Sequence, residues 1–268
     1  MTGYLALDEG LRNERIQRFC LMDDVFMTAF FNGNKPCTEH VLRIIMGKPK
    51  LVVKSVRVQK ELKNLYGRTI KLDVAALDDD GEDIDIEVQR EDRGANPGRA
   101  RYHSSLLDAN VTYPIGKYCE ELRPAYVIFI TENDVLGGGQ PLYIVRRHIE
   151  MPGGVYLPFG DGSNIIYVNG AMRDEQTPLG RLMHDFFCTR AADMYSPLLA
   201  EHMKFFKESE KGVLAVSSVV DEIRNEAMYE VAIRMLSMGK YPHEEIAQCS
   251  DLDLATVERL AAEMTAAS

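Results

Sequence analysis

Apolar residues recur along this chain at two spacings, and the spacing changes from one segment to the next. Residues 11–31 and residues 38–47 show the period of an amphipathic helix. We expect Thr38 to cap the second of these helices and Gly47 to end it, because both residue types favour those positions. Residues 51–59 are rich in β-branched side chains, which favours a strand.

Strands and helices then alternate as far as residue 170. The pattern predicts two strands around a turn in 68–90, a helix in 96–111, and strands in 124–131, 141–148 and 164–170, with Gly- and Pro-rich loops between the last two. Beyond residue 170 the spacing is helical. We therefore expect an α/β domain at residues 1–170 and a helical C-terminal region at residues 171–268.

The composition is that of a globular protein, with 46% hydrophobic and 27% charged residues in a chain of 268. Acidic residues number 41 and basic residues 31, so the formal net charge is −10. This balance excludes a uniformly basic nucleic-acid coat protein. It does not exclude a local basic face, because net charge says nothing about distribution.

Motifs for a membrane, a secretory pathway or zinc are missing from the sequence. The apolar runs are far shorter than the about 20 residues that a membrane-spanning helix needs. The first residues lack the apolar segment of a secretory signal. Five cysteines form no CxxC pair, and six histidines form no HExxH motif. We expect reduced thiols, a cytoplasmic location, no membrane contact and no zinc chemistry.

Residues 70–89 alternate apolar and polar side chains in two runs on either side of an acidic turn. Successive side chains of a strand point to opposite faces, so each run has one apolar face and one face with acids. Gly81 can adopt the left-handed backbone that a three-residue hairpin loop requires. A loop at residues 79–81 places Asp73 directly across from Glu87, whereas a slip of one residue would separate them.

Two carboxylates that face each other repel by roughly 3 kcal/mol at 5 Å and an effective dielectric near 20. A proton, a cationic side chain or a metal ion can relieve that repulsion. Mg²⁺ binds one or two carboxylates together with waters and phosphate oxygens, as metal-assisted phosphodiester hydrolysis requires. Acids on the polar face of a hairpin are also common as a solvated surface, so the pattern alone leaves both interpretations open.

Several segments follow one another along the chain, namely LMDDVFMTAFF, LDVAALDDDGEDIDIEVQRED, RARYHSSLLDANV, TPLGRLMHDFFC and a helical tail. Together and in this order they resemble the PD-(D/E)xK nuclease-family transposases, also called Rpn-like recombination-promoting nucleases. This resemblance implies a restriction-endonuclease-like α/β fold, a mixed sheet flanked by helices. It also implies DNA cleavage with Mg²⁺, for which Mn²⁺ can substitute, and a link to recombination, mobile elements or phage conflict.

The resemblance also assigns roles to residues. Asp73 and Glu87 fall on the two acids that bind the metal, and Gln89 falls on the third catalytic position of the family's (D/E)xK strand. An upstream catalytic acid falls on Asp23, with Asp24 as a close rival.

Two positions depart from the family's pattern, because Gln89 replaces the usual Lys and Met27 stands where related proteins often have Lys. Gln89 carries no positive charge, although it can orient a water or a phosphate oxygen by hydrogen bonding. Both changes remove positive charge near the scissile phosphate. The alternative is a catalytically degenerate nuclease-fold module that binds DNA or another protein.

Basic residues concentrate between positions 48 and 71, where Glu61 is the one acid. This segment is the best candidate for a phosphate-facing surface, although a solvated strand face is an equal alternative. The DNA contacts we expect are Lys54, Arg57, Lys60 and Lys63, with Arg101 from the following helix. A homodimer is a further expectation, because cutting both strands would suggest two active sites.

Other motifs favour structural roles. His184 and Asp185 suggest a catalytic dyad, but adjacent residues of a helix point about 100° apart, so we expect a structural role for both. We expect His103 on the surface or in packing. Residues 242–263 have the spacing of a helix-turn-helix with an acidic second helix, which favours packing or oligomerisation over DNA recognition.

Overall fold

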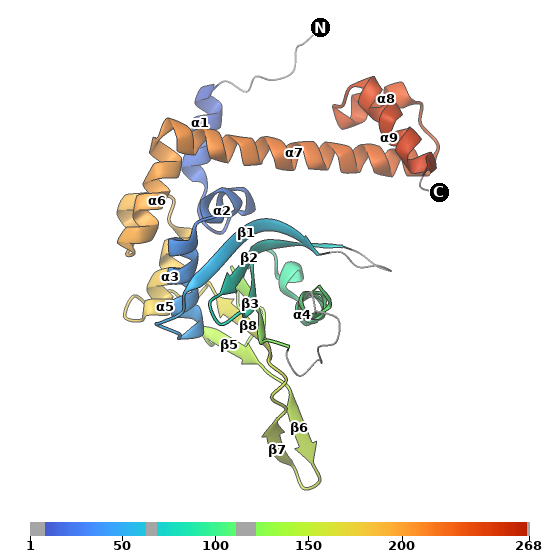
Figure 1. Ribbon diagram of the computed structural model, residues 1–268. Coiled ribbons are helices and arrows are strands. Elements are labelled where there is room, and N and C mark those ends of the chain that lie inside the picture. The colour runs from blue at the N-terminus through green and yellow to red at the C-terminus, as the bar shows by residue number, and fades with distance from the viewer. Residues whose placement is uncertain (1–8, 63–68, 111–121, 267–268) are drawn as a thin grey trace. The chain divides into compact units, whose positions relative to one another are not determined.

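The computed structural model describes residues 9–62, 69–110 and 122–266 (Figure 1). Its elements are α1 (Glu9–Arg18), α2 (Asp24–Phe31), α3 (Lys35–Met46), β1 (Val53–Leu62), β2 (Ile70–Asp78), β3 (Asp83–Gln89), the 3-10 helix η1 (Asp92–Ala95), α4 (Pro97–Ala109), β4 (Ala125–Thr131), β5 (Leu142–Val145), β6 (His148–Met151), β7 (Val155–Pro158), β8 (Ser163–Asn169), α5 (Pro178–Phe187), the 3-10 helix η3 (Ala191–Asp193), α6 (Pro197–Glu208), α7 (Glu210–Met238), α8 (His243–Ser250) and α9 (Leu254–Ala266). They form two compact units, Met1–Val213 and Leu214–Ser268.

The first unit is built on a six-stranded mixed sheet with the order β1-β2-β3-β4-β8-β5. Strands β3, β4 and β8 run parallel, whereas β1, β2 and β5 pair antiparallel to their neighbours. Helices flank this sheet, and helices follow it to the C-terminus. The predicted α/β class is therefore confirmed, while the domain boundary at residue 170 stays a prediction; α5 and α6 belong to the first unit.

The two faces of the sheet carry different side chains. α4 packs on β4 and β8, while α2 and α3 pack against β1 on the other side (Figure 1). Parallel register aligns Glu87, Phe129 and Tyr167 in one row. Phe129 and Tyr167 belong to the apolar cluster under α4, so this row points toward α4. The acids predicted to lie on one face of the hairpin therefore share a face with α4.

The N-terminal helices differ from the sequence prediction in two ways. The helix predicted over residues 11–31 is divided, because α1 ends at Arg18 and α2 begins at Asp24. The cap of α3 is Asn34, whose side chain accepts a backbone N–H of the first turn, and not Thr38, which lies buried inside the helix. Gly47 ends α3 as predicted, with a φ of 64°.

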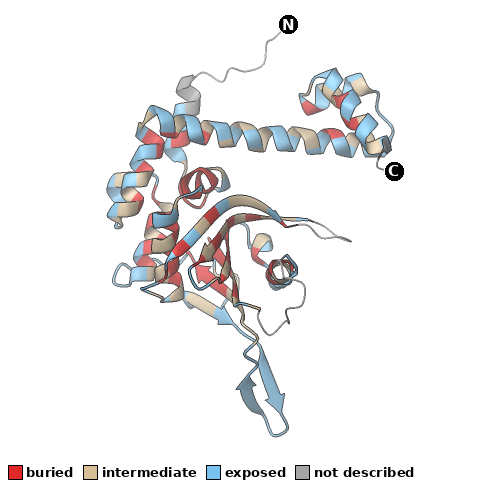
Figure 2. Cartoon of the chain, viewed as in Figure 1, coloured by how far each residue is buried: buried red, intermediate tan, exposed pale blue. Residues whose placement is uncertain are grey.

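The strands β6 and β7 form a separate two-stranded sheet that the sequence prediction had partly assigned to loop. Every residue of the two strands is exposed (Figure 2). Each strand has only four residues and lies beside Gly and Pro residues that resemble loop, although Ile149 and Met151 of β6 alternate with polar residues.

The second unit has a small apolar core of its own, formed by Ala232, Ile246, Val257 and Leu260. α8 and α9 meet at Asp251, which has a left-handed φ of 56°. The two predicted short helices around a turn are therefore observed. None of the helices in the described ranges is long and apolar enough to span a membrane.

Candidate metal centre

The hairpin β2–β3 has the predicted register. Ala75 lies opposite Asp85 and Val74 opposite Ile86, and Gly81 in the turn has a φ of 79°. The backbone N–H of Asp73 donates to Glu87 Oε1 at 3.1 Å. The N–H of Val88 donates to Asp73 Oδ2, also at 3.1 Å. Each carboxylate thus accepts an amide of the other strand, which holds the two acids side by side.

A third acid, Asp85, and His103 of α4 complete a buried cluster. Asp85, Glu87 and His103 each offer one possible metal-ligand atom, and these atoms lie within 4.8 Å of one another. His103 Nδ1 lies 2.9 Å from Asp85 Oδ2 and 3.7 Å from Glu87 Oε1. Asp85 and Glu87 are completely buried, whereas Asp73 is half-buried. Asp85 Oδ1 has no hydrogen-bond partner in the described part of the chain.

α4 supplies the basic partners of these acids. Asn96 caps the helix by accepting the N–H of Arg99 at 2.9 Å, and this cap fixes where the helix starts. Arg99 and His103 are four residues apart and therefore share one side of α4. Arg99 donates to Glu87 Oε2 at 2.8 Å, so one of the three acids has an arginine partner.

The hydrogen bonds of His103 indicate which tautomer is present. Arg99 Nε donates to His103 Nε2 at 3.3 Å, so Nε2 is an acceptor. A neutral ring then carries its proton on Nδ1 and donates it to Asp85. Burial lowers the pKa of His103, which favours this neutral form. In this arrangement His103 orients Asp85, and the carboxylates remain the groups that could hold a metal ion.

The electrostatics of the cluster favour added positive charge. Burial, followed by repulsion from neighbouring acids, raises the pKa of Asp73 and of Asp85 well above the usual range. Burial and the charge of Asp85 raise the pKa of Glu87 to about 8. With Arg99 charged and His103 neutral, three ionised carboxylates leave two net negative charges. Two protons or one divalent cation can balance them.

Asp24, the rival of Asp23, is the acid that acts electrostatically on this cluster. Its charge raises the pKa of Asp73, which requires proximity. Asp23 instead accepts the N–H of Cys20 at 2.8 Å and pairs with Arg90 at 3.1 Å. Asp23 thus has one partner in the turn before α2 and another directly after β3.

Gln89 and Met27 occupy different environments. Gln89 ends β3, and its side chain lies over Gly94 of η1, where an added Cβ would come within 1.9 Å of Gln89 Oε1. In the described part of the chain, the side chain of Gln89 therefore packs against η1. Met27 is completely buried in α2, which accounts for an apolar residue at this position.

The predicted DNA contacts lie on two elements. Lys54 and Arg57 are exposed on β1, Lys60 is half-buried there, and Arg101 is exposed on α4. Lys63 lies outside the described residues. Arg57 of β1 lies opposite Ala75 of β2, and Ala75 lies opposite Asp85 of β3. Arg57 therefore shares the face of the sheet that carries the acids.

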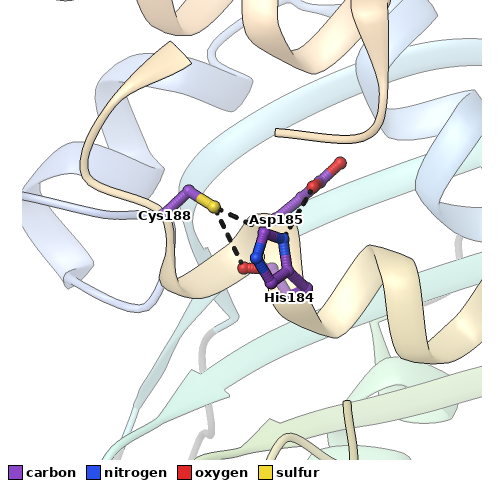
Figure 3. Close-up of side chains that lie close together, drawn as sticks. All are labelled: His184, Asp185 and Cys188. Carbon is purple, nitrogen blue, oxygen red and sulfur yellow. Dashed lines mark hydrogen bonds and ion pairs between the residues drawn. The ribbon is translucent and has the colours of Figure 1, made fainter. Parts of the chain in front are cut away.

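A second cluster combines His184, Asp185 and Cys188 at the end of α5 (Figure 3). His184 Nδ1 lies 3.4 Å from Asp185 Oδ1, so our expectation that the two side chains point apart is wrong. Asp185 also accepts the backbone N–H groups of Tyr195 and Ser196 at 2.7 and 2.8 Å. Burial raises the pKa of Cys188 to about 11, which disfavours the thiolate that binds metals. These contacts support the structural role that the sequence favoured.

The sequence reasoning missed three members of the cluster on the sheet. Asp85 precedes Glu87 by two residues and therefore lies on the same face of the strand, a pattern from which it could have been identified as a site residue. His103, which we expected on the surface or in packing, is 2% exposed and paired with that acid. Arg99 shares the helix side of His103, but its contact with Glu87 depends on how α4 docks.

Comparison with known proteins adds no relative. No family model, no curated protein and no solved structure matches this chain. The resemblance to PD-(D/E)xK nuclease-family transposases therefore stays a prediction, and what the chain itself provides is a mixed α/β fold with buried acidic and histidine groups able to bind a metal.

Proposed function

We propose that this chain is a Mg²⁺-dependent DNA endonuclease with a restriction-endonuclease-like core. The observation that carries the proposal is the charge deficit at Asp73, Asp85 and Glu87, three neighbouring carboxylates that Arg99 balances only in part. A divalent cation relieves this deficit and is the cofactor of phosphodiester hydrolysis.

Asp73 and Glu87 would hold the ion, and His103 would keep Asp85 oriented beside them. The bound ion would polarise the phosphoryl group and lower the pKa of the attacking water. Arg99 is 36% exposed, so its guanidinium can leave Glu87 and contact a phosphate oxygen instead. Gln89 would orient the water, and Asp24, with Asp23 as the sequence-based alternative, would assist as the upstream acid.

DNA would approach over β1 and α4. Lys54, Arg57 and Lys60 supply positive charge beside the acidic hairpin, and Arg101 supplies it from α4. Phosphate contacts of this kind make binding weaken steeply with salt. A homodimer belongs to the proposal because two active sites would allow a double-strand cut, and light scattering of the purified protein with and without DNA tests it.

The experiment is cleavage of supercoiled plasmid by purified protein with Mg²⁺ or Mn²⁺. We expect nicking by the wild type and its loss in Asp73→Asn and Glu87→Gln. Asp79→Asn is the matched control, because Asp79 is an exposed acid in the turn of the same hairpin. Nicking that persists in both cluster variants would overturn the proposal.

The contact between Arg99 and Glu87 favours a second candidate function, a degenerate nuclease-fold module that binds DNA or protein. A permanent ion pair would withdraw Glu87 from metal binding, and Gln89 removes the usual Lys. Salt-dependent DNA binding with no cleavage under any divalent ion would favour this candidate. Metal binding by calorimetry that is lost in Glu87→Gln would count against it.

A further inference from the structure

A pocket of about 370 Å³ lies on the flank of α4 that faces away from the acids. Pro97, Arg101 and Ser104 of α4 line it at helical spacing, whereas Arg99 and His103 form a separate stripe that contacts the acids. One helix thus separates two sites on the same face of the sheet.

The body of the pocket is apolar. Ile165 of β8, Val145 of β5 and Leu136 are among its lining residues. Val145 and Leu136 are 44% and 38% exposed, so apolar side chains also surround the opening. The volume is at the lower end of the range for small-molecule sites, which are mostly apolar with a few polar groups.

The polar groups of the pocket favour an anion. Arg101, Arg146 and Arg147 line it. Arg147 pairs with Asp161 at 2.6 Å. In the described part of the chain, neither Arg101 nor Arg146 is in an ion pair, although Arg146 Nε donates to Asn164 at 3.3 Å. Guanidinium groups bind phosphates and carboxylates through paired hydrogen bonds.

A buried hydroxyl provides an independent indication of a ligand. Tyr167 lines the pocket and is 3% exposed, and its hydroxyl has no hydrogen-bond partner among the described residues. Ser104 and Ser163, also in the lining, pair their hydroxyls at 3.0 Å. A buried polar group without a partner is unfavourable, and a bound molecule with a donor or acceptor would satisfy it.

We propose that this pocket binds a small organic monophosphate with a compact apolar or aromatic body. The body contacts Val145, Ile165 and Leu136, and the phosphate contacts Arg101 and Arg146. A free aryl or nucleoside monophosphate and a nucleotide unit of a DNA strand share this chemistry. The proposal does not depend on the nuclease function, because the acids lie on the other side of α4.

The experiment is calorimetric titration of the full chain with 1-naphthyl phosphate. Inorganic phosphate and 1-naphthol are the matched probes for the charge and for the apolar body alone. We expect 1-naphthyl phosphate to bind about tenfold more tightly than either. Thymidine 5′-monophosphate and a thymidine oligonucleotide are then tested as competitors of 1-naphthyl phosphate. Displacement of 1-naphthyl phosphate by the monophosphate alone indicates that the natural ligand is a free monophosphate. Stronger displacement by the oligonucleotide indicates that it is a nucleotide unit of a DNA strand.

Variants localise the binding. Val145→Trp fills the opening, and Ile144→Trp is its control, because Ile144 is the exposed neighbour whose side chain alternates to the other face. We expect Val145→Trp, Arg101→Gln and Arg146→Gln each to weaken naphthyl phosphate about tenfold, with binding unchanged in Ile144→Trp.

The proposal is overturned if naphthyl phosphate binds no more tightly than inorganic phosphate, or if Val145→Trp and Ile144→Trp bind it equally. Asp73→Asn separates the two functions: it should abolish nicking and leave naphthyl phosphate binding unchanged. Loss of both in this folded variant would mean that the pocket is not a separate site.

Discussion

Two clusters among the described residues place histidine beside acids, and they differ in how the charges of the acids are satisfied. At the end of α5, Asp185 accepts the backbone N–H groups of Tyr195 and Ser196. On the sheet, Asp85 leaves one oxygen without a partner in the described part of the chain, and burial raises the pKa of Glu87 to about 8.

The comparison shows that spacing alone does not identify a metal centre. Both clusters place their possible ligand atoms within 4.8 Å of one another. In the α5 cluster two backbone amides already satisfy the oxygens of Asp185, so the fold is complete without an ion. In the cluster on the sheet the acids lack positive charge, so the fold favours a proton or a cation. The first cluster is structural, and the second is the candidate for chemistry.

The largest effect should come from removing a carboxylate of the cluster on the sheet. Glu87→Gln should lower metal-dependent nicking by about 100-fold or more, because loss of an outer-shell partner alone typically costs 10–100-fold. The protein should stay folded, since the neutral amide resembles the protonated acid. Plasmid nicking and circular dichroism measure the two effects. Undiminished nicking would contradict the assignment.

In the α5 cluster we expect a substitution to lower stability without lowering nicking. Tyr195 and Ser196 donate to different oxygens of Asp185, so Asp185→Asn replaces one of these acceptors with an N–H₂ donor, and the free energy of unfolding should fall by about 2 kcal/mol. Nicking per folded molecule should not change, because the cluster holds no reacting group in our account. Urea unfolding gives the stability. A specific loss of nicking without loss of stability would place chemistry at α5.

The cluster on the sheet should also make the stability of the protein depend on pH. Glu87 keeps its proton to about pH 8 when folded but loses it near 4.5 when unfolded. Its stabilising contribution is therefore complete below pH 4.5 and is lost as pH rises through about 8. Without metal, the wild type should lose stability across this window relative to Glu87→Gln. Thermal unfolding of both proteins from pH 5 to 8.5 measures the difference. Parallel curves of stability against pH for the two proteins would refute the raised pKa of Glu87.

The smallest expected effect concerns Gln89. Gly94→Ala should displace the amide of Gln89, because the new Cβ would come within 1.9 Å of Oε1. The side chain is flexible, so stability should change by less than about 1 kcal/mol. If the position of Gln89 orients the attacking water, nicking should fall while metal affinity stays unchanged. Equal nicking by Gly94→Ala and wild type would remove Gln89 from the account.

The sequence was sufficient to predict the register of the hairpin but not the side chains that pack around it. A period of two and Gly81 determine the register, so Asp73 and Glu87 could be placed side by side in advance. The roles of Arg99 and His103 depend on the docking of α4 against the sheet, which no local pattern encodes.

The choice between Asp23 and Asp24 was also beyond the sequence. Both acids begin a helix, and a helix N-terminus favours either one. The break between α1 and α2 lies inside a segment whose apolar spacing predicted one continuous helix, so the sequence did not show that Asp23 caps α2 and Asp24 begins it. Tertiary packing, rather than local preference, decides which acid approaches Asp73.

The central claim is that the acids on the sheet lack positive charge that a divalent cation supplies. Calorimetric titration of the protein with Mn²⁺ in two buffers of different ionisation enthalpy tests it most directly, because metal binding must displace protons from these acids. The account predicts one ion per chain, with proton release, and loss of both in Glu87→Gln but not in Asp185→Asn. No binding by the wild type, or equal binding by Glu87→Gln, would contradict it.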